Sequence, residues 1–486
     1  MKAFQTLFFI LGVIALLALT SWLFPAEGVT VMGKTLYFPS LEDVLVSDET
    51  RESALLHLEE MERQRNIRLF QDSLNRKFQD SLNFYNHFFE NNPGRFHIPN
   101  NNYEYFAELF KELEEAKSKG RTVHILHYGD SQIEGDRITG YIRQRMQERF
   151  GGNGAGLLPA VQIIPSTCVG QTYSGGIERY IVSGAHSKTC GHRRYGALGQ
   201  MGQLYSGGSI SVSSRNWKNT FENVKEFSRV RLYVGNTENF STTISAGGST
   251  HQPTHTRSNS FVKIYDWELN SPVKKVTVNM SGKAEIYGVS LDGEGGVAVD
   301  NIPFRGSSGT FFTSIDSTSL VSMYKDLDVG LILLEFGGNT MPVVKSDKTV
   351  DYYKTRISTQ LAYLKRVYPQ ARIVFIGPSD MATTVGGKLQ TYPYMEKFIQ
   401  GLKEAAHENG VVFWSMFDAM GGRDSMISWV KNSPSLAATD YIHFNNRGVE
   451  KIAEIFFESL MIYYDYYQFK QNHDAEKAKG TQYLLP

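Results

Sequence analysis

The chain has 486 residues, more than one hydrophobic core usually organises, so we expect a main domain and at least one further module. Hydrophobic residues make up 41% and charged residues 21%, which is ordinary for a globular protein. The 50 basic residues balance the 50 acidic ones, and this balance gives no sign of nucleic-acid binding.

The N-terminal segment is apolar. No charged residue occurs from Ala3 to Ala26, and the run Leu7–Phe24 is nearly long enough to cross a bilayer as a helix. Lys2 precedes it, which favours a cytoplasmic N-terminus and export of everything that follows. A cleaved signal peptide is the alternative. Because a small-x-small cleavage site is missing, we expect residues 1–28 to be a retained transmembrane anchor and the protein to face the periplasm or another extracytoplasmic space.

The next segment, residues 29–120, is expected to form a helical stalk or linker. Glu, Lys, Arg, Gln and Leu dominate it from about Ser47, with apolar residues at helical spacing. The sequence FQDSLN occurs twice, beginning at Phe70 and Phe78, which indicates a duplicated helical turn. Prolines and asparagines between Asn91 and Asn102 interrupt the helix.

From Arg121 the pattern changes to alternating strands and helices. Such continuous apolar strands between helices predict a parallel sheet covered on both faces, an α/β/α sandwich. The predicted strands are Thr122–Tyr128, Val329–Phe336, Arg372–Ile376 and Val411–Phe417, and the predicted helices are Asp136–Phe150, Tyr352–Tyr368, Met395–Asn409 and Val449–Met461.

A different stretch interrupts this α/β pattern. Short alternating runs separated by Gly, Ser, Asn and Thr predict an all-β sandwich over residues 166–293, inserted into an α/β domain made of residues 121–165 and 294–468. Residues 469–486 form a C-terminal tail. The insertion holds both cysteines of the chain, Cys168 and Cys190, which either pair with each other or remain free buried thiols.

Three short motifs follow predicted strands or precede predicted helices. Ser131 in Gly-Asp-Ser lies where a strand ends and a helix begins, the place where catalytic groups gather in open α/β sheets. Asn339 in Gly-Gly-Asn ends another strand, and its side-chain amide suits an oxyanion donor. Taken singly, a helix cap and a turn explain these two motifs equally well.

The third motif is Asp440-Tyr441-Ile442-His443, just before the last predicted helix. A serine hydroxyl needs a base to remove its proton, and histidine is the usual one. A carboxylate three residues earlier can hold the other ring nitrogen and stabilise the imidazolium. Such a pair also marks metal ligands or surface loops, so the motif indicates a catalytic site only together with the other two motifs.

In this order the motifs resemble those of the SGNH hydrolases, also called GDSL-type esterases. The resemblance implies Ser131, Asp440 and His443 as the catalytic triad. It implies an oxyanion hole formed by Ser131, Gly306 and Asn339, and it implies no metal and no cofactor. Gly154 and Gly156 are rival positions for the oxyanion glycine. Gln132 departs from the pattern, since leucine or histidine commonly follows the serine in relatives.

The layout also resembles bacterial peptidoglycan O-acetylesterases and related envelope polysaccharide acetylesterases or acetyltransferases. It combines an exported chain, an insertion after the first motif, and Met420-Gly421-Gly422 with Trp429 before the last one. In those relatives the inserted domain resembles a carbohydrate-binding module. Aromatic side chains of the insertion either stack on sugars or belong to its core, and sandwich aromatics are more often core. They are Tyr173, Trp217, Tyr233, Tyr265 and Trp267.

Other polar residues of the α/β part have simpler explanations. His124 and His127 lie on one predicted strand, and we expect them to be packed or hydrogen-bonded rather than metal ligands. Glu335 ends the strand before Asn339, and we expect a structural partner for it. The sequence contains neither HExxH nor HxxEH, the short zinc motifs of metallopeptidases.

These observations predict a serine esterase that removes O-acetyl groups from an envelope polysaccharide such as peptidoglycan. Its partners would then be an acetylated glycan and, through the N-terminal helix, the membrane. One alternative is a polysaccharide O-acetyltransferase that uses the same triad with a membrane acetyl-donor partner. Another is an inactive glycan-binding protein.

Overall fold

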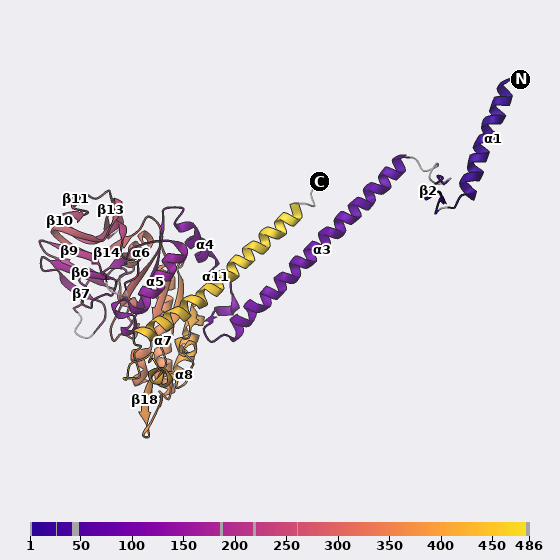
Figure 1. The fold of residues 1–486 in the computed structure, drawn as a ribbon. Helices are drawn as coiled ribbons and strands as arrows, with labels where there is room; N and C mark the ends of the chain where they lie inside the picture. The colour runs from indigo at the N-terminus through magenta and orange to yellow at the C-terminus, as the bar shows by residue number, and fades with distance from the viewer. Residues whose placement is uncertain are drawn as a thin grey trace. The chain divides into compact units, whose positions relative to one another are not determined.

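The computed structural model describes residues 2–25, 27–40, 48–184, 188–216, 220–259 and 261–482. It consists of two compact units, Met1–Leu82 with His473–Pro486, and Asn83–Asn472 (Figure 1). Trp217, one of the aromatic residues of the insertion, lies outside the described residues.

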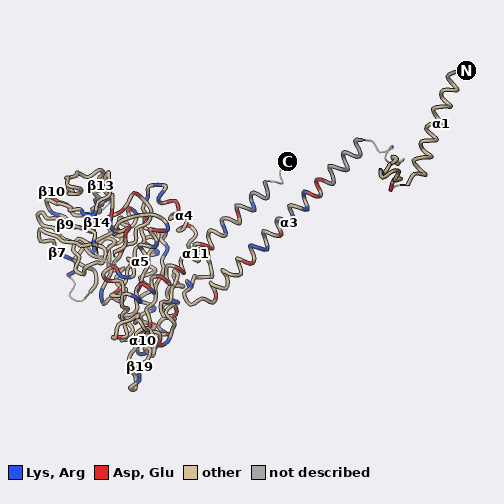
Figure 2. Tube along the Cα trace, viewed as in Figure 1, with Lys and Arg blue, Asp and Glu red and all other residues tan. Residues whose placement is uncertain are grey.

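The first unit begins with α1 (Lys2–Leu23), whose stretch Phe4–Leu23 is long and apolar enough to cross a membrane. A retained anchor and a signal sequence both meet this criterion. A short hairpin follows, β1 (Val29–Val31) paired with β2 (Lys34–Leu36). The helix α3 (Asp48–Asn91) carries many charged side chains, whereas α1 shows none over its described side chains (Figure 2).

The second unit is organised around a six-stranded sheet. Its strand order is β15 (Gly296–Pro303), β4 (Thr122–Gly129), β16 (Val329–Glu335), β17 (Arg372–Ile376), β20 (Val412–Trp414) and β3 (Phe96–His97). The first five strands are parallel, and only β3 runs antiparallel to its neighbour. β4 and β16 are buried along their whole length, which explains their unbroken apolar sequences.

Helices cover both faces of this sheet, so the predicted α/β/α sandwich is confirmed. On one face Phe110 of α4 and Phe150 of α5 both pack against Tyr464 of α11. On the other face Tyr324 of α6 meets Tyr368 at the end of α7. The helices are α4 (Ala107–Ala116), α5 (Arg137–Phe150), α6 (Ser317–Asp326), α7 (Asp347–Val367), α8 (Met395–Glu408), α9 (Met416–Ala419), α10 (Ser425–Lys431) and α11 (Asn446–Gln482).

Among the described residues, four 3-10 turns connect these elements, η1 (Pro99–Asn101), η2 (Ser131–Asp136), η3 (Phe312–Ser314) and η4 (Gly338–Val343). A two-stranded hairpin, β18 (Ala382–Val385) with β19 (Lys388–Thr391), projects from the α/β part (Figure 1).

The insertion forms a second, antiparallel sheet of ten strands (Figure 1). Two long strands, β10 and β14, pair along most of their length, and the register shifts between Tyr233 and Ser241 mark where the sheet bends. Its halves enclose one apolar core, as predicted for a sandwich. The strands are β5 (Gly156–Leu158), β6 (Val169–Ser174), β7 (Glu178–Ile181), β8 (Gln200–Leu204), β9 (Gly207–Ser214), β10 (Phe227–Ala246), β11 (Ser249–His251), β12 (His255–Asn259), β13 (Val262–Val273) and β14 (Lys275–Asp292).

Several boundaries differ from those expected. β5 pairs with β14, so the second sheet begins at Gly156 rather than near residue 166. The stalk expected over 29–120 is too long, because β3 joins the sheet and α4 buries Leu109, Phe110 and Leu113. The last helix continues to Gln482 through the expected tail. The strand expected over Val411–Phe417 ends at Trp414 because Ser415 caps α9.

Buried ionic groups join the two sheets. His124 of β4 is fully buried, and its Nδ1 lies 2.7 Å from Asp300 Oδ2 on β15. Its Nε2 accepts a hydrogen bond from Arg231 Nη2 of β10 at 2.9 Å, and Arg231 also donates to Asp292 Oδ2 at 2.6 Å. The expectation that His124 is a hydrogen-bonded strand residue is confirmed.

The aromatic side chains and the cysteines of the insertion differ in burial. Tyr233, Tyr265 and Trp267 are buried in the core, whereas Tyr173 is exposed. Both cysteines are free rather than paired, and Cys168 is buried whereas Cys190 is only partly buried. Burial raises the pKa of the Cys168 thiol, which therefore stays protonated at neutral pH.

Candidate active site

The nucleophile position is a sharp turn at the carboxyl end of β4. Asp130 follows the strand, and its Oδ1 accepts from the Gln132 backbone N–H at 3.0 Å, which starts the turn η2 at Ser131. Ser131 is partly buried, and its Oγ lies 3.2 Å from His443 Nε2. The sheet edge therefore presents the hydroxyl to a histidine that is 312 positions away in the chain.

The loop before α11 supplies this histidine and its carboxylate. His443 Nδ1 lies 2.8 Å from Asp440 Oδ2, while Asp440 Oδ1 accepts the backbone N–H groups of Ile442 and His443 at 2.9 and 3.0 Å. Burial opposes ionisation of Asp440, but these hydrogen bonds outweigh it and hold the pKa of Asp440 below its ordinary value. An ionised Asp440 accepts from Nδ1–H, so Nε2 remains free to accept the Ser131 proton.

Hydrogen bonds from Gln132 and Arg137 hold this loop against the nucleophile turn. Gln132 Nε2 donates to the Ile442 carbonyl at 3.0 Å. Arg137 donates to the Phe444 carbonyl and to the Gln132 carbonyl, both at 3.2 Å. Gln132, noted in the sequence as a departure from the family pattern, thus links the nucleophile turn to the His443 loop. Neither role has a sequence signal, because the bonds to the Ile442 and Phe444 carbonyls are made to backbone atoms 310 and 307 positions away.

Asn339 lies on the other side of the nucleophile turn. Its Nδ2 donates to Asp130 Oδ2 at 2.8 Å and to the Ser307 carbonyl at 3.2 Å. Burial, together with the nearby Glu335 carboxylate, raises the pKa of Asp130 to about 7, although the Gln132 and Asn339 hydrogen bonds lower it. The Asn339 amide is thus next to the serine turn with both of its N–H bonds engaged.

Gly306, the predicted oxyanion glycine, is exposed on the loop after β15. The adjacent residue, Ser307, accepts from Asn339, so this loop reaches the Asn339 side of the site. Gly306 has φ +73° and nothing near the position of a Cβ. The rivals are explained by packing, since a Cβ on Gly154 would meet the Leu291 carbonyl oxygen at 2.2 Å and one on Gly156 would meet Asp300 at 2.1 Å.

A cavity of about 180 Å³ opens beside these groups. Ser131, Asn339 and His443 line it, with Pro378, Met381 and Met416 on its apolar side. Glu335 also borders it, and its Oε2 lies 3.1 Å from Nε2 of the buried His127. The expected structural partner of Glu335 is therefore present, and His127 is hydrogen-bonded as predicted, its Nδ1 lying 3.0 Å from Thr139 Oγ1.

Within the described ranges, no group of three or more His, Cys, Asp or Glu side chains is arranged to hold a metal ion. The arrangement can support nucleophilic acyl transfer: a serine hydroxyl, a base held in one tautomer, and an amide donor beside a small, partly apolar cavity.

Comparisons with known proteins define the fold. No protein-family model and no curated protein sequence matches the chain. Among solved structures, a peptidoglycan O-acetylesterase aligns with 20% identity and a TM-score of 0.58, covering 74% of this chain and 95% of its own. This chain therefore shares the fold of that esterase.

Two further solved structures are much less similar. A family two carbohydrate esterase from Clostridium thermocellum aligns with 11% identity and a TM-score of 0.25, over 60% of this chain and 98% of its own. A psychrotrophic esterase from Pseudoalteromonas sp. aligns with 13% identity and a TM-score of 0.25, over 35% and 79%.

Proposed function

We propose that the protein is a serine esterase that removes O-acetyl groups from a cell-envelope polysaccharide, with peptidoglycan as its substrate. The observation that carries the proposal is the hydrogen-bonded series Asp440, His443 and Ser131 at the carboxyl edge of a parallel sheet. The shared fold with a peptidoglycan O-acetylesterase and the apolar N-terminal helix support the substrate and the envelope location.

In this mechanism Ser131 Oγ attacks the acetyl carbonyl carbon while its proton passes to His443 Nε2. The tetrahedral intermediate collapses, the sugar oxygen takes the proton from Nε2, and acetyl-Ser131 remains. Water then attacks this ester, giving its proton to Nε2. Acetate leaves, and Ser131 Oγ takes the proton back.

The negative oxygen of each intermediate needs donors. The backbone N–H groups of Ser131 and Gly306 and the side chain of Asn339 fill this role in the proposal. Asn339 must then exchange one of its present bonds, and the bond to the Ser307 carbonyl, at 3.2 Å, is the longer of the two. A short rotation of the Asn339 amide would redirect that N–H to the substrate oxygen.

The test uses release of acetate from acetylated peptidoglycan and from a chromogenic acetate ester. Ser131→Ala should abolish both activities and labelling by a fluorophosphonate probe, since the variant lacks the attacking oxygen. Ser118→Ala, which changes an exposed serine of the α4–β4 connection, serves as the matched control and should behave as wild type. Retained hydrolysis in Ser131→Ala would overturn the proposal.

The fate of the acetyl group separates an esterase from a transferase. A wild-type protein that labels at Ser131 but passes acetyl only to a sugar hydroxyl, with no free acetate, would replace hydrolysis by transfer. A protein that neither labels nor releases acetate would be a non-catalytic glycan-binding protein.

A further inference from the structure

A second cleft lies at the same end of the sheet as Ser131, between the α/β part and the ten-stranded sheet. It has a volume of about 80 Å³. Gly135 and Pro303 line it from the α/β side, and Arg179 of β7 and Gln200 of β8 line it from the other sheet. Apolar side chains, among them Ile163 and Ile164, complete its wall.

Arg179 is the unusual member of this cleft. Its Nε donates to Gln200 Oε1 at 2.7 Å, and among the described residues no carboxylate lies within ion-pair distance of its guanidinium. Partial burial lowers the pKa of Arg179, with no acidic group acting to raise it. A guanidinium remains charged in proteins, so a partly desolvated positive charge faces the cleft without a negative partner.

The nearby acidic groups are already paired. Asp136, which also lines the cleft, makes two hydrogen bonds to Arg143 at 2.6 and 2.9 Å. Glu178, the neighbour of Arg179 on β7, is bonded to Tyr180 and Tyr205 at 2.8 Å each and pairs with Lys188. The charge of Arg179 is therefore left for a group from outside the chain.

The cleft is close to the candidate nucleophile. Gly135 belongs to the turn that Ser131 begins, and four residues of chain span at most about 14 Å. Pro303 is in register with Gly129 on the neighbouring strand, immediately before the serine turn. The wall of the cleft that Gly135 and Pro303 form is therefore close to Ser131, and Arg179 belongs to the opposite wall.

We propose that Arg179 binds a carboxylate of the polysaccharide substrate, next to the unit whose ester reacts at Ser131. This inference rests on the proposed function. The cleft volume accommodates several water molecules, and so a carboxylate but not a sugar ring, which stays at the rim. The planar guanidinium offers the two parallel N–H donors that carboxylates accept.

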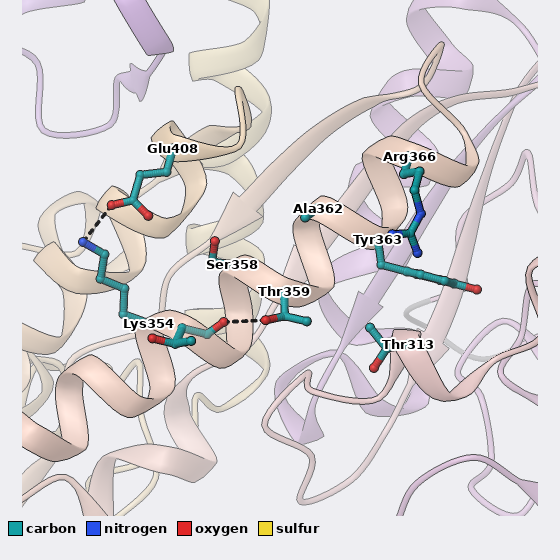
Figure 3. A pocket seen from close by; sticks show the side chains of 9 residues that line it. Thr313, Lys354, Ser358, Thr359, Ala362, Tyr363, Arg366 and Glu408 are labelled. Atoms are coloured by element: carbon teal, nitrogen blue, oxygen red, sulfur yellow. Dashed lines mark hydrogen bonds and ion pairs between the residues drawn. The ribbon is translucent and has the colours of Figure 1, made fainter.

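In the larger groove along α7, no partly buried cation among the described residues lacks a carboxylate partner. It measures about 500 Å³ and is lined by Thr313, Ser358, Lys354 and Arg366 (Figure 3). Lys354 is paired with Glu404 and Glu408, both at 2.8 Å, and the exposed Arg366 stacks over the Tyr363 ring at 5.5 Å. Arg366 thus serves as a matched control arginine.

The test compares two disaccharide esters in which 6-O-acetyl-N-acetylglucosamine is linked to N-acetylmuramic acid or to N-acetylglucosamine, so that only the first has a lactyl group with its carboxylate on the neighbouring unit. Wild type should show a KM at least about 10-fold lower for the disaccharide with muramic acid, as for one charge-assisted contact. Arg179→Gln should abolish this ratio, Arg179→Lys should keep part of it, and Arg366→Gln should keep all of it. A second pair, in which the neighbouring unit is glucuronic acid or its methyl ester, distinguishes a uronate from the lactyl group.

An unchanged ratio in Arg179→Gln, or no preference for either acid in wild type, would overturn the inference while leaving the esterase intact. If wild type cleaves none of these esters, the proposed function fails. Calorimetry with the same four full-length proteins then compares the binding of N-acetylmuramic acid with that of N-acetylglucosamine. This measurement tests carboxylate binding in the cleft independently of catalysis. Binding of the acid that Arg179→Gln weakens at least about 10-fold supports the site, and equal binding refutes it.

Discussion

Two histidine–carboxylate pairs in this protein are nearly identical in their inner geometry. His124 Nδ1 lies 2.7 Å from Asp300, and His443 Nδ1 lies 2.8 Å from Asp440. In both, the other ring nitrogen accepts a hydrogen bond. For His124 the donor is Arg231, and neither member of the pair is exposed; for His443 the donor is Ser131, and the side chains are 40% and 46% exposed.

This difference separates a structural pair from a candidate catalytic pair. The Arg231 guanidinium keeps its protons, so the buried pair has no proton to transfer and only joins two sheets. The Ser131 hydroxyl can give up its proton, and the exposure lets a polymer and water reach the pair. The distance between histidine and carboxylate alone therefore does not identify a catalytic dyad.

Removing each imidazole in turn tests most directly whether the two histidines differ in function. His443→Ala should lower kcat on a chromogenic acetate ester by about 10⁴-fold or more, because the general base is lost. His124→Gln should leave kcat of the folded fraction at the wild-type value. Loss of kcat in both variants, at equal folded fraction by circular dichroism, would show that the buried pair also serves the reaction.

Removing each carboxylate should reverse the order of effects on stability. Asp300→Asn removes the charge beside His124 and breaks a buried network, which should lower the free energy of unfolding by about 3–5 kcal/mol. Asp440→Asn, at an exposed pair, should lower it by less than about 1 kcal/mol. Urea denaturation measures both, and similar losses would contradict the contrast in burial.

A smaller effect is expected where Gln132 holds the exposed pair in place. Gln132→Leu removes the hydrogen bond to the Ile442 carbonyl, which should cost about 1 kcal/mol and lower kcat/KM about 3- to 10-fold. Gln400→Leu, an exposed change on α8, is the matched control. An unchanged kcat/KM in Gln132→Leu would mean that Arg137 suffices to hold the loop.

The smallest effect concerns Asp130, the carboxyl between Ser131 and Asn339. Because the pKa of Asp130 is raised to about 7 in the folded protein, the folded state binds more protons than the unfolded one between pH 4 and 7. Its contribution to stability should therefore fall as pH rises through this range. Asp130→Asn should flatten this part of the stability-against-pH curve, and an identical slope in both proteins would contradict the shifted pKa.

Much of the α/β sheet could be predicted because its strands are long apolar runs. β4, β16 and β17 lie within a residue of their predicted ends. β3 has only two residues and forms only because β20 offers it a partner, so no local pattern reveals it. α4 was predicted as a helix, but whether its apolar face packs on the sheet or on another helix depends on contacts far along the chain.

The residues of the candidate site also divide into those that the sequence predicts and those that it does not. Ser131, Asn339, Asp440 and His443 lie in short motifs, and the fold brings them to one edge. Gly306 remains a prediction, since the residue of its loop that accepts a hydrogen bond from Asn339 is Ser307. Arg179 could not be predicted from the sequence, because a single arginine on a strand forms no pattern. Its interest comes from the three-dimensional structure, in which it bonds to Gln200 and to no carboxylate of the described residues.

The two ends of the insertion lie side by side where the chain leaves and re-enters the α/β part. The Val297 backbone N–H donates to the Gly151 carbonyl at 2.9 Å, so the chain leaves for the second sheet and returns at almost one point. Closing a long excursion costs an entropy that grows only with the logarithm of its length. Segments of other lengths could therefore replace this one at the same crossing point, and substrate range could change without rebuilding the edge that holds Ser131.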